Sequence, residues 1–393
     1  RQGPTEIPEP FHQSENSYLS LRPAKKPLHM TVSEITTLLE EQAPLPFAED
    51  FDNVGLLVGD PSMEVTGILV TLDTLESVVD EAVAKKCNLI VSFHPILFKG
   101  LKRITGKTYV ERTVLKAIQN GVAIYSMHTA LDNVREGVNG KICEVLGLEK
   151  TRILIPKTGV IKKLVTYVPV GSKDTLLEKL FETGAGHLGN YSHCSFTSEG
   201  TGSFLPGQEA NPAIGKQGDL QREPEVQVHI TFTHDREKAV LRALFAHHPY
   251  EEVAYEVTTL ENQYGHLGMG MVGELPQAMA PKDFLQHVRD RFHCGCIRHS
   301  ELPQTPFRRV AVLGGSGAFA IGAAKAAGAD ILITADVKYH QFYQAEGKMV
   351  IADIGHYETE QFTKNLLAEY LSEKIPNFAI SLSETKTNPI NYF

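Results

Sequence analysis

The stretch NLIVSFHP, residues 88–95, decides the predicted fold because an apolar run there ends in a histidine. Similar short apolar runs cover residues 67–73 and 122–127, and segments with helical periodicity separate the runs at residues 75–86 and 108–119. Short apolar strands that alternate with helices are typical of a buried, mostly parallel sheet. This part of the chain is therefore predicted to be an α/β domain.

The pattern changes near residue 160 and returns after about residue 275. The middle stretch predicts two strand–helix–strand-like units around a loop-rich segment at residues 198–224, and therefore a compact α+β module. Strand-like runs of the first type then follow at residues 309–313, 330–334, 348–352 and 376–382. We expect one α/β domain in two halves, an inserted module, and a disordered extension before Met30. The predicted ranges are 30–158 and 273–393 for the halves, 159–272 for the module and 1–29 for the extension.

Composition limits the class of protein. The 393 residues are enough for two or three domains, and no apolar stretch approaches the roughly 18 residues of a membrane span. The net charge of −9 disfavours a general nucleic-acid coat protein. The 5 cysteines match neither a disulfide framework nor a zinc ribbon, which indicates a reducing compartment and a cytoplasmic location.

Histidines and acids follow several of the predicted strands in both halves of the α/β domain. In chain order they are His94, His128, Asp132, Asp336, His356 and Glu360. The carboxyl ends of parallel strands are where open sheets bind ligands, so we expect these side chains to lie close together.

Imidazole and carboxylate groups are ligands of Zn, Fe, Mn and Ni, and a mixed set can hold two ions bridged by a carboxylate or hydroxide. His356 and Glu360, four residues apart, would share one face of a helix start. Each candidate also has an ordinary structural explanation, as a loop histidine, a turn acid beside Asn133, or a helix cap at Asp336. Their shared position at strand ends favours the metal site.

Three further motifs have both a functional and a structural explanation. The segment GSGAFA, residues 315–320, precedes Asp336 in the form of a dinucleotide fingerprint, but a tight strand-to-helix turn explains its glycines equally well. The segment HHPYEE, residues 247–252, looks like a metal cluster, although a helix-end turn is favoured. Cys294 and Cys296 are expected to be ordinary thiols.

Four motifs follow one another along the chain: DNVGL (52–56), SFHPILF (92–98), HTALD (128–132) and GHYETE (355–360). As a set they resemble the Nif-three-like family, also labelled GTP cyclohydrolase I type two homologs, and the resemblance covers residues 30–393. The middle of the chain, at residues 184–194 and 248–252, is similar to the inserted domain of the long bacterial form. The resemblance therefore implies a ferredoxin-like module of the type found in PII and CutA proteins.

The resemblance also implies a centre with two transition-metal ions per chain, with Zn first and Fe, Mn or Ni as alternatives. Carried over by motif, the ligands are His94, Asp132, His356 and Glu360. His128 is implied as a further ligand or close neighbour, and Asp336 is a positional candidate for a supporting role. This chain departs from the family pattern at Phe93, where a histidine is usual, and at Ala130, where an asparagine is common.

The resemblance implies a homohexameric ring and a metal-dependent hydrolase, in which a metal-bound hydroxide attacks a small, nucleotide-like substrate. No catalytic residue beyond the metal ligands is assigned. The alternative is a non-catalytic ring scaffold that binds nucleic acid, metal or protein partners. An NAD-binding oxidoreductase is a third class, and it would need no metal.

Overall fold

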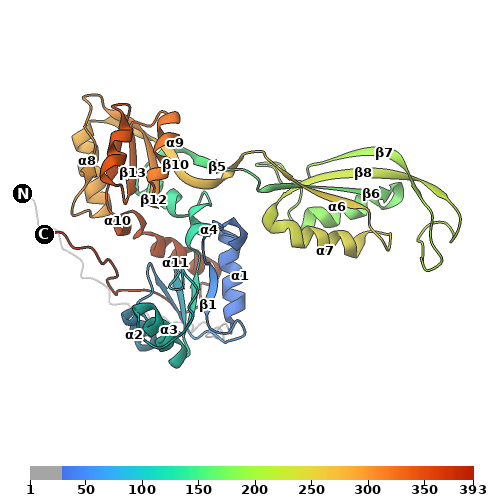
Figure 1. The fold of residues 1–393 in the computed structure, drawn as a ribbon, viewed down its shortest axis with the longest axis horizontal. Coiled ribbons are helices and arrows are strands. Elements are labelled where there is room, and N and C mark those ends of the chain that lie inside the picture. The colour runs from blue at the N-terminus through green and yellow to red at the C-terminus, as the bar shows by residue number, and fades with distance from the viewer. Residues whose placement is uncertain (1–28) are drawn as a thin grey trace, which may run out of the picture.

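The computed structural model describes residues 29–393, and the strands form three sheets (Figure 1). The predicted extension, residues 1–29, lies outside the described residues except for His29. Two sheets come from the α/β segments, and the third belongs to the inserted module, which projects away from them in Figure 1. No helix within residues 29–393 is long and apolar enough to cross a membrane.

The first sheet has the strand order β1-β4-β3-β2-β15, and all its neighbours are parallel except β1 and β4. Its strands are β1 (Gly55–Val58), β2 (Ile68–Thr71), β3 (Leu89–Ser92), β4 (Ala123–Ser126) and β15 (Ile380–Leu382). Its helices are α1 (Val32–Gln42), α2 (Glu76–Ala84), α3 (Tyr109–Gln119) and α11 (Thr363–Lys374). Helices α2 and α3 cover one face, and α11 covers the other with α1 beside it. Because both faces are covered, β2, β3 and β4 are buried throughout and mostly apolar, which is the pattern seen in the sequence.

The second sheet has the order β11-β14-β13-β12-β10-β5, with β12, β13 and β14 parallel and the outer pairs antiparallel. Its strands are β5 (Glu149–Lys157), β10 (Tyr264–Met279), β11 (Arg298–His299), β12 (Phe307–Ser316), β13 (Ile331–Ala335) and β14 (Val350–Asp353). Its helices are α5 (Val138–Leu146), α8 (Pro281–Phe292), α9 (Ile321–Ala326) and the 3₁₀ helices η4 (Ala318–Ala320) and η5 (Tyr339–Ala345). Each sheet includes a strand from the other part of the chain. β5, which precedes the inserted module, lies in the second sheet, and β15, the last strand of the chain, lies in the first.

The inserted module has the element order β6 (Ile161–Pro169), α6 (Lys173–Glu182), β7 (Ser195–Phe204), β8 (Gln221–Thr233), α7 (Glu237–His247) and β9 (Tyr255–Leu260). Its antiparallel sheet has the order β7-β8-β6-β9, which is the ferredoxin-like arrangement. Both helices pack through leucine and valine side chains onto one face, as Figure 1 shows. The expected α+β module is therefore confirmed.

The segment predicted to be loop-rich, residues 198–224, has strand at both ends and a loop between them. β7 continues to Phe204 and β8 begins at Gln221, so the loop is confined to residues 205–220. Gly202 illustrates why the composition was misleading. A Cβ at this position would lie 2.0 Å from Glu225 Oε2 on the paired strand, so the glycine makes room for a side chain instead of ending the strand.

Two helices of only five residues each carry residues of the candidate functional site. α4 (His128–Asp132) follows β4 in the first sheet, and α10 (His356–Glu360) follows β14 in the second. The remaining 3₁₀ helices are η1 (Leu45–Phe47), η2 (Val170–Ser172) and η3 (His234–Arg236). Gln361 and Phe362 separate α10 from α11, so the two are distinct helices.

Candidate metal centre

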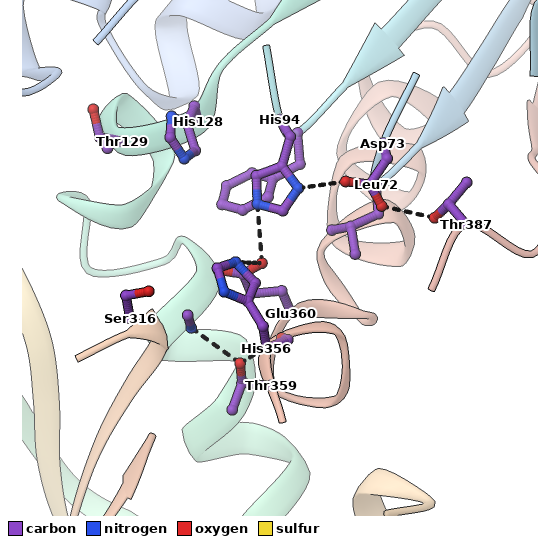
Figure 2. A network of polar contacts seen from close by, with 12 residues as sticks. Leu72, Asp73, His94, His128, Thr129, Ser316, His356, Thr359, Glu360 and Thr387 are labelled. Atoms are coloured by element: carbon purple, nitrogen blue, oxygen red, sulfur yellow. Dashed lines mark hydrogen bonds and ion pairs between the residues drawn. The ribbon is translucent and has the colours of Figure 1, made fainter. Parts of the chain in front are cut away.

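The candidate centre lies where the carboxyl ends of the parallel strands of both sheets meet (Figure 2). His94 lies two residues after the end of β3, and His128 begins α4 after β4. From the other sheet, His356 and Glu360 begin and end α10 after β14. These side chains come together because the two sheets face each other through their strand ends.

The side chain of Glu360 is the focus of the centre. Its Oε2 atom lies 3.1 Å from Nε2 of His94 and 3.1 Å from Nε2 of His356. Figure 2 shows both imidazole rings turned toward this carboxylate. Within residues 29–393, these three residues are the one group of at least three potential His, Cys, Asp or Glu ligands whose donor atoms all lie within 4.8 Å of one another.

The histidines of the centre share a second feature, a carboxylate at Nδ1. His94 Nδ1 lies 2.8 Å from Asp73 Oδ1, and His356 Nδ1 lies 2.7 Å from Asp336 Oδ2. Each contact fixes the tautomer, because an ionised carboxylate accepts the hydrogen bond and the ring must donate it. Nε2 is then the nitrogen available to a metal ion, as in carboxylate–histidine–metal arrangements.

His128 has the same arrangement, with its Nδ1 2.8 Å from Asp52 Oδ1. The hydroxyl of Thr129 donates a 2.5 Å hydrogen bond to Asp52 Oδ2, which orients that carboxylate in turn. The His128 and His94 rings have centroids 5.3 Å apart, so His128 borders the group of three.

Hydroxyl groups orient the other two supporting aspartates. Thr387 donates a 2.7 Å hydrogen bond to Asp73 Oδ2, and the Ser316 hydroxyl donates to Asp336 Oδ2. The end of β12 also contributes: the backbone N–H of Gly315 donates to Thr359 Oγ1 on α10 over 3.0 Å. This hydrogen bond therefore connects the second sheet to the helix that carries His356 and Glu360.

The pKa values of the groups in the centre show that its buried carboxylates depend on positive charge beside them. Burial raises the pKa of Asp132 well above its ordinary range, and the nearby Glu360 charge raises it further. Burial alone would also raise the pKa of Glu360, but His356 and His94 lower it to about 2. Burial lowers the pKa of His94, but Asp73 and Glu360 raise it more, to about 10. A metal cation could supply the positive charge that the protonated imidazoles supply in its absence.

Two buried oxygen atoms provide a direct test of whether a metal ion fits. Asp132 Oδ1 and Glu360 Oε2 are buried without a hydrogen-bond partner among the described residues. The 3.1 Å contacts of Glu360 Oε2 with His94 and His356 are ion-pair distances, but neither has hydrogen-bond geometry. A buried charged oxygen without a partner is costly, and coordination to a metal would satisfy both atoms. The donor set of imidazole nitrogens and carboxylate oxygens therefore fits a divalent transition metal.

The structure brings His94, His356 and Glu360 together and places the other sequence candidates around them. Asp132 is outside the group of three, but its charge interacts with both Glu360 and His94.

Sequence reasoning missed the supporting residues Asp73, Asp52, Ser316 and Thr387. Asp73 had a usable signal, because it is the last residue of a predicted strand-like run, residues 67–73. Thr387 had none, since its contact with Asp73 joins positions more than 300 residues apart.

The competing motifs have structural roles. Gly315 has φ +66°, and a Cβ there would lie 2.4 Å from Glu360 Oε1, so this glycine is needed by the metal centre. His248 is the C-cap of α7, and its Nε2 lies 2.9 Å from the Tyr167 carbonyl, as expected for a helix-end turn. Phe93, at the position where the resemblance implies a histidine, is fully buried, with its ring centroid 4.8 Å from that of His94.

Fold and site together define an α/β protein with a histidine–carboxylate centre between two sheets and an inserted ferredoxin-like module. A family model described as Duf34/NIF3 (NGG1p interacting factor 3) matches residues 30–389, and the chain belongs to this family. The resemblance inferred from the motifs is thereby confirmed.

Relatives match over nearly the whole chain. A Bacillus subtilis protein named GTP cyclohydrolase 1 type 2 homolog is 37% identical over 364 residues, which cover 91% of this chain and 98% of the relative. A crystal structure of a Bacillus cereus protein related to NIF3 has a TM-score of 0.81 at 36% identity, covering 93% of this chain and 99% of that one. A Staphylococcus aureus crystal structure has a TM-score of 0.73 at 29% identity, with the same coverage.

Proposed function

We propose that this protein is a metal-dependent hydrolase that acts on a small, phosphate-bearing substrate of the nucleotide type. The observation that carries the proposal is the arrangement at Glu360. One buried carboxylate oxygen without a hydrogen-bond partner faces the Nε2 atoms of His94 and His356, and aspartates hold both rings at Nδ1. An ordinary ion pair does not need both rings to be oriented in this way. The arrangement has the form of a metal site.

The centre would hold two divalent ions, with Zn first among the candidates and Fe, Mn or Ni as alternatives. Its ligands would be His94, Asp132, His356 and Glu360. His128 would be a further ligand or a close neighbour of the second ion. When bound, such ions lower the pKa of water toward neutrality and polarise the substrate. Asp336 is better suited to hold His356 than to accept a proton, because Ser316 and His356 already contact its Oδ2.

The surroundings of His94 favour an anionic substrate with a planar ring. A cavity of about 580 Å³ is lined by His94, Phe98, Lys99 and Tyr109, among others. Its lining also includes the acids Asp73 and Glu111, whose carboxylates are hydrogen-bonded to His94 and Thr105, respectively. The exposed segment 99–107 also carries Lys102, Arg103 and Lys107, which is a local excess of positive charge in a chain of net charge −9. Lysine and arginine bind phosphate, and exposed aromatic rings can stack on a base. The relatives' name, GTP cyclohydrolase 1 type 2 homolog, is consistent with this substrate class.

The proposal includes a homohexameric assembly. Its support in this chain is the apolar surface of the inserted module, where Phe245 and Tyr255 are exposed and their ring centroids lie 5.2 Å apart. Exposed aromatic pairs beside an edge strand are typical of self-association surfaces.

The first experiment is elemental analysis of the purified protein. We expect two equivalents of a transition metal per chain, and their loss from the variant His356→Ala with Glu360→Ala. The matched control is His299→Ala with Glu301→Ala, which removes the same two residue types at exposed positions and should keep the metal. Absence of metal from the wild type after reconstitution would rule out the proposal.

Phe93→His tests whether the second ion needs the imidazole that is usual in the family. Because Phe93 contacts the rings of both His94 and His128, the new imidazole would join the centre. One equivalent in the wild type and two in Phe93→His would show that the native centre is mononuclear.

Turnover distinguishes the hydrolase from the binding alternative. The metal-loaded protein is incubated with a panel of nucleoside triphosphates and monophosphates, and the products are separated by chromatography. Hydrolysis that is lost in His356→Ala with Glu360→Ala supports the enzyme. A full metal complement without turnover of any nucleotide, together with a ring assembly, would favour the scaffold that binds metal or a macromolecule.

A further inference from the structure

The inserted module contains a cavity that is separate from the metal centre. Its volume is about 630 Å³, and it is lined by parts of β7 and β8, the loop that joins them, and the turn after α7. In Figure 1 the β7–β8 end of the module lies remote from the two α/β sheets. The proposed hydrolase reaction makes no use of this cavity.

Glu225 on β8 is the polar residue that defines the cavity. The residue is only 8% exposed, and its Oε1 accepts a 2.7 Å hydrogen bond from the Tyr250 hydroxyl. Burial and the neighbouring carboxylate raise the pKa of Tyr250, so the phenol remains a donor. Oε2 has no hydrogen-bond partner among the described residues, and it lies where a Cβ on Gly202 would clash. Oε2 is not among the fully buried oxygens without a partner, so it keeps some contact with solvent, and its residue lines the cavity. A ligand group that donates a hydrogen bond can therefore reach it.

The charges of the residues that line the cavity indicate the charge of that ligand. Its lining includes Glu199, Glu251 and Glu252 as well as Glu225, but no lysine, arginine or histidine. An anion such as a nucleotide would therefore meet only negative charge, in contrast to the surface beside His94. A metal ion is also disfavoured, because no three potential ligand atoms in this part of residues 29–393 lie within 4.8 Å of one another.

The remaining lining provides apolar surface for the body of the ligand. Phe204 packs beside Tyr250 with ring centroids 5.8 Å apart, and Ile214 also faces the cavity. Leu205 lines the cavity and is 62% exposed, so its apolar side chain remains available for contact. Aromatic rings also attract cations through their faces.

We propose that this cavity binds an organic ammonium ion, with the ammonium group at Glu225 and the apolar body against Phe204, Leu205 and Ile214. The ammonium would donate to Glu225 Oε2, the one oxygen of that carboxylate without a partner. The inference does not depend on the proposed hydrolase activity, since no residue of the metal centre takes part.

The probe is phenethylammonium, and its neutral counterpart is 2-phenylethanol, which has nearly the same shape. The chain contains no tryptophan, so Leu205→Trp introduces a single fluorescent reporter at the cavity. We expect saturable quenching or enhancement with phenethylammonium, and binding of the alcohol that is weaker by about tenfold or more. Titration calorimetry on the chain with Leu205 retained checks that the reporter itself does not create or block the site.

Glu225→Gln keeps the shape of the side chain and a group that can contact Tyr250, but it removes the charge. It should weaken phenethylammonium binding by about tenfold or more, whereas Glu261→Gln, at an exposed position outside the cavity, should leave binding unchanged. Equal affinity for the ammonium and the alcohol, tighter binding of ATP than of the ammonium, or no effect of Glu225→Gln would each overturn the proposal. If Glu225→Gln fails to fold, the ammonium–alcohol comparison in the wild type still decides it.

Discussion

The aspartates behind the histidines set the direction of the ligand atoms. Asp73, Asp52 and Asp336 each contact Nδ1 of one ring, so the opposite nitrogen of each imidazole is left for coordination. The aspartates come from segments far apart in the sequence, and hydroxyl groups hold all three. The protein itself therefore sets the orientation of the rings, without a bound metal ion.

Asp336→Asn tests this positioning role. An amide can still contact His356 Nδ1, but it lacks the charge that makes the imidazole a stronger ligand, so we expect metal affinity to fall by about 10–100-fold. Competition with a colorimetric zinc chelator measures the change. The control is Asp290→Asn on α8, where the side chain only accepts from Gln286. Equal affinity in both variants would contradict the role.

At this scale, the sequence was sufficient for the candidate ligands and insufficient for the residues that contact them. His94, His356 and Glu360 could be predicted because each follows an apolar strand or lies one helical turn beyond. Ser316 could not be predicted, because its contact with Asp336 depends on two strand ends meeting in space. Serine after glycine is otherwise an ordinary turn sequence.

Among the elements, the end of β12 determines how closely α10 can approach the second sheet. Gly315, the residue before the last of this strand, has φ +66° and lies directly against Glu360. Gly347 provides a matched comparison, because its φ is +65° and a Cβ there would meet nothing within 4 Å. The two glycines thus separate backbone strain from contact with the centre.

Gly347→Ala should lower the free energy of unfolding by about 1 kcal/mol, through backbone strain alone. Gly315→Ala should cost more, about 2–4 kcal/mol, and should also weaken metal binding, because the added methyl group displaces the Glu360 carboxylate. Urea unfolding gives the first quantity, and chelator competition gives the second. Normal metal affinity in Gly315→Ala would show that α10 moves freely to accommodate the methyl group.

The buried parallel strands were the elements that the sequence predicted well. β2, β3 and β4 have apolar residues on both faces, so a local pattern was enough. β10 was missed because Gly265, Gly268, Gly270 and Gly273 lower its strand propensity. It is nevertheless paired with β5 on one side and β12 on the other, and this pairing overrides the local preference.

At the scale of the whole molecule, the C-terminal segment fastens the last strand to the first sheet and reaches the metal centre. Glu81 on α2 accepts hydrogen bonds from the Ser383 and Thr385 side chains and from the Glu384 backbone N–H. A few residues later, Thr387 contacts Asp73 behind His94. No local pattern predicts these contacts, because they join segments about 300 residues apart in the chain.

Glu81→Gln should reduce stability in a pH-dependent way. Burial alone would raise the pKa of Glu81, but these hydrogen bonds and Lys85 lower it to about 2. Because the folded-state pKa is below the ordinary 4.5, this stabilisation is present above pH 4.5 and is lost as the pH falls toward 2. We expect the wild type to exceed Glu81→Gln by about 1–3 kcal/mol at pH 7 and by much less near pH 2. Urea unfolding at both pH values tests this, and a constant difference would contradict it.

The surface of the inserted module makes the proposed assembly testable. Phe245 on α7 is 51% exposed and Tyr255 on the edge strand β9 is 41% exposed, so together they present apolar area without a partner in the single chain. We expect native mass spectrometry to find six chains in the wild type, and smaller species when Phe245→Ser and Tyr255→Ser are combined, because the apolar contact is removed. Phe319→Ser, at a 60% exposed position outside the module, serves as the control. A monomeric wild type would refute the assembly, whereas a double variant that stays hexameric would place the interface on another surface.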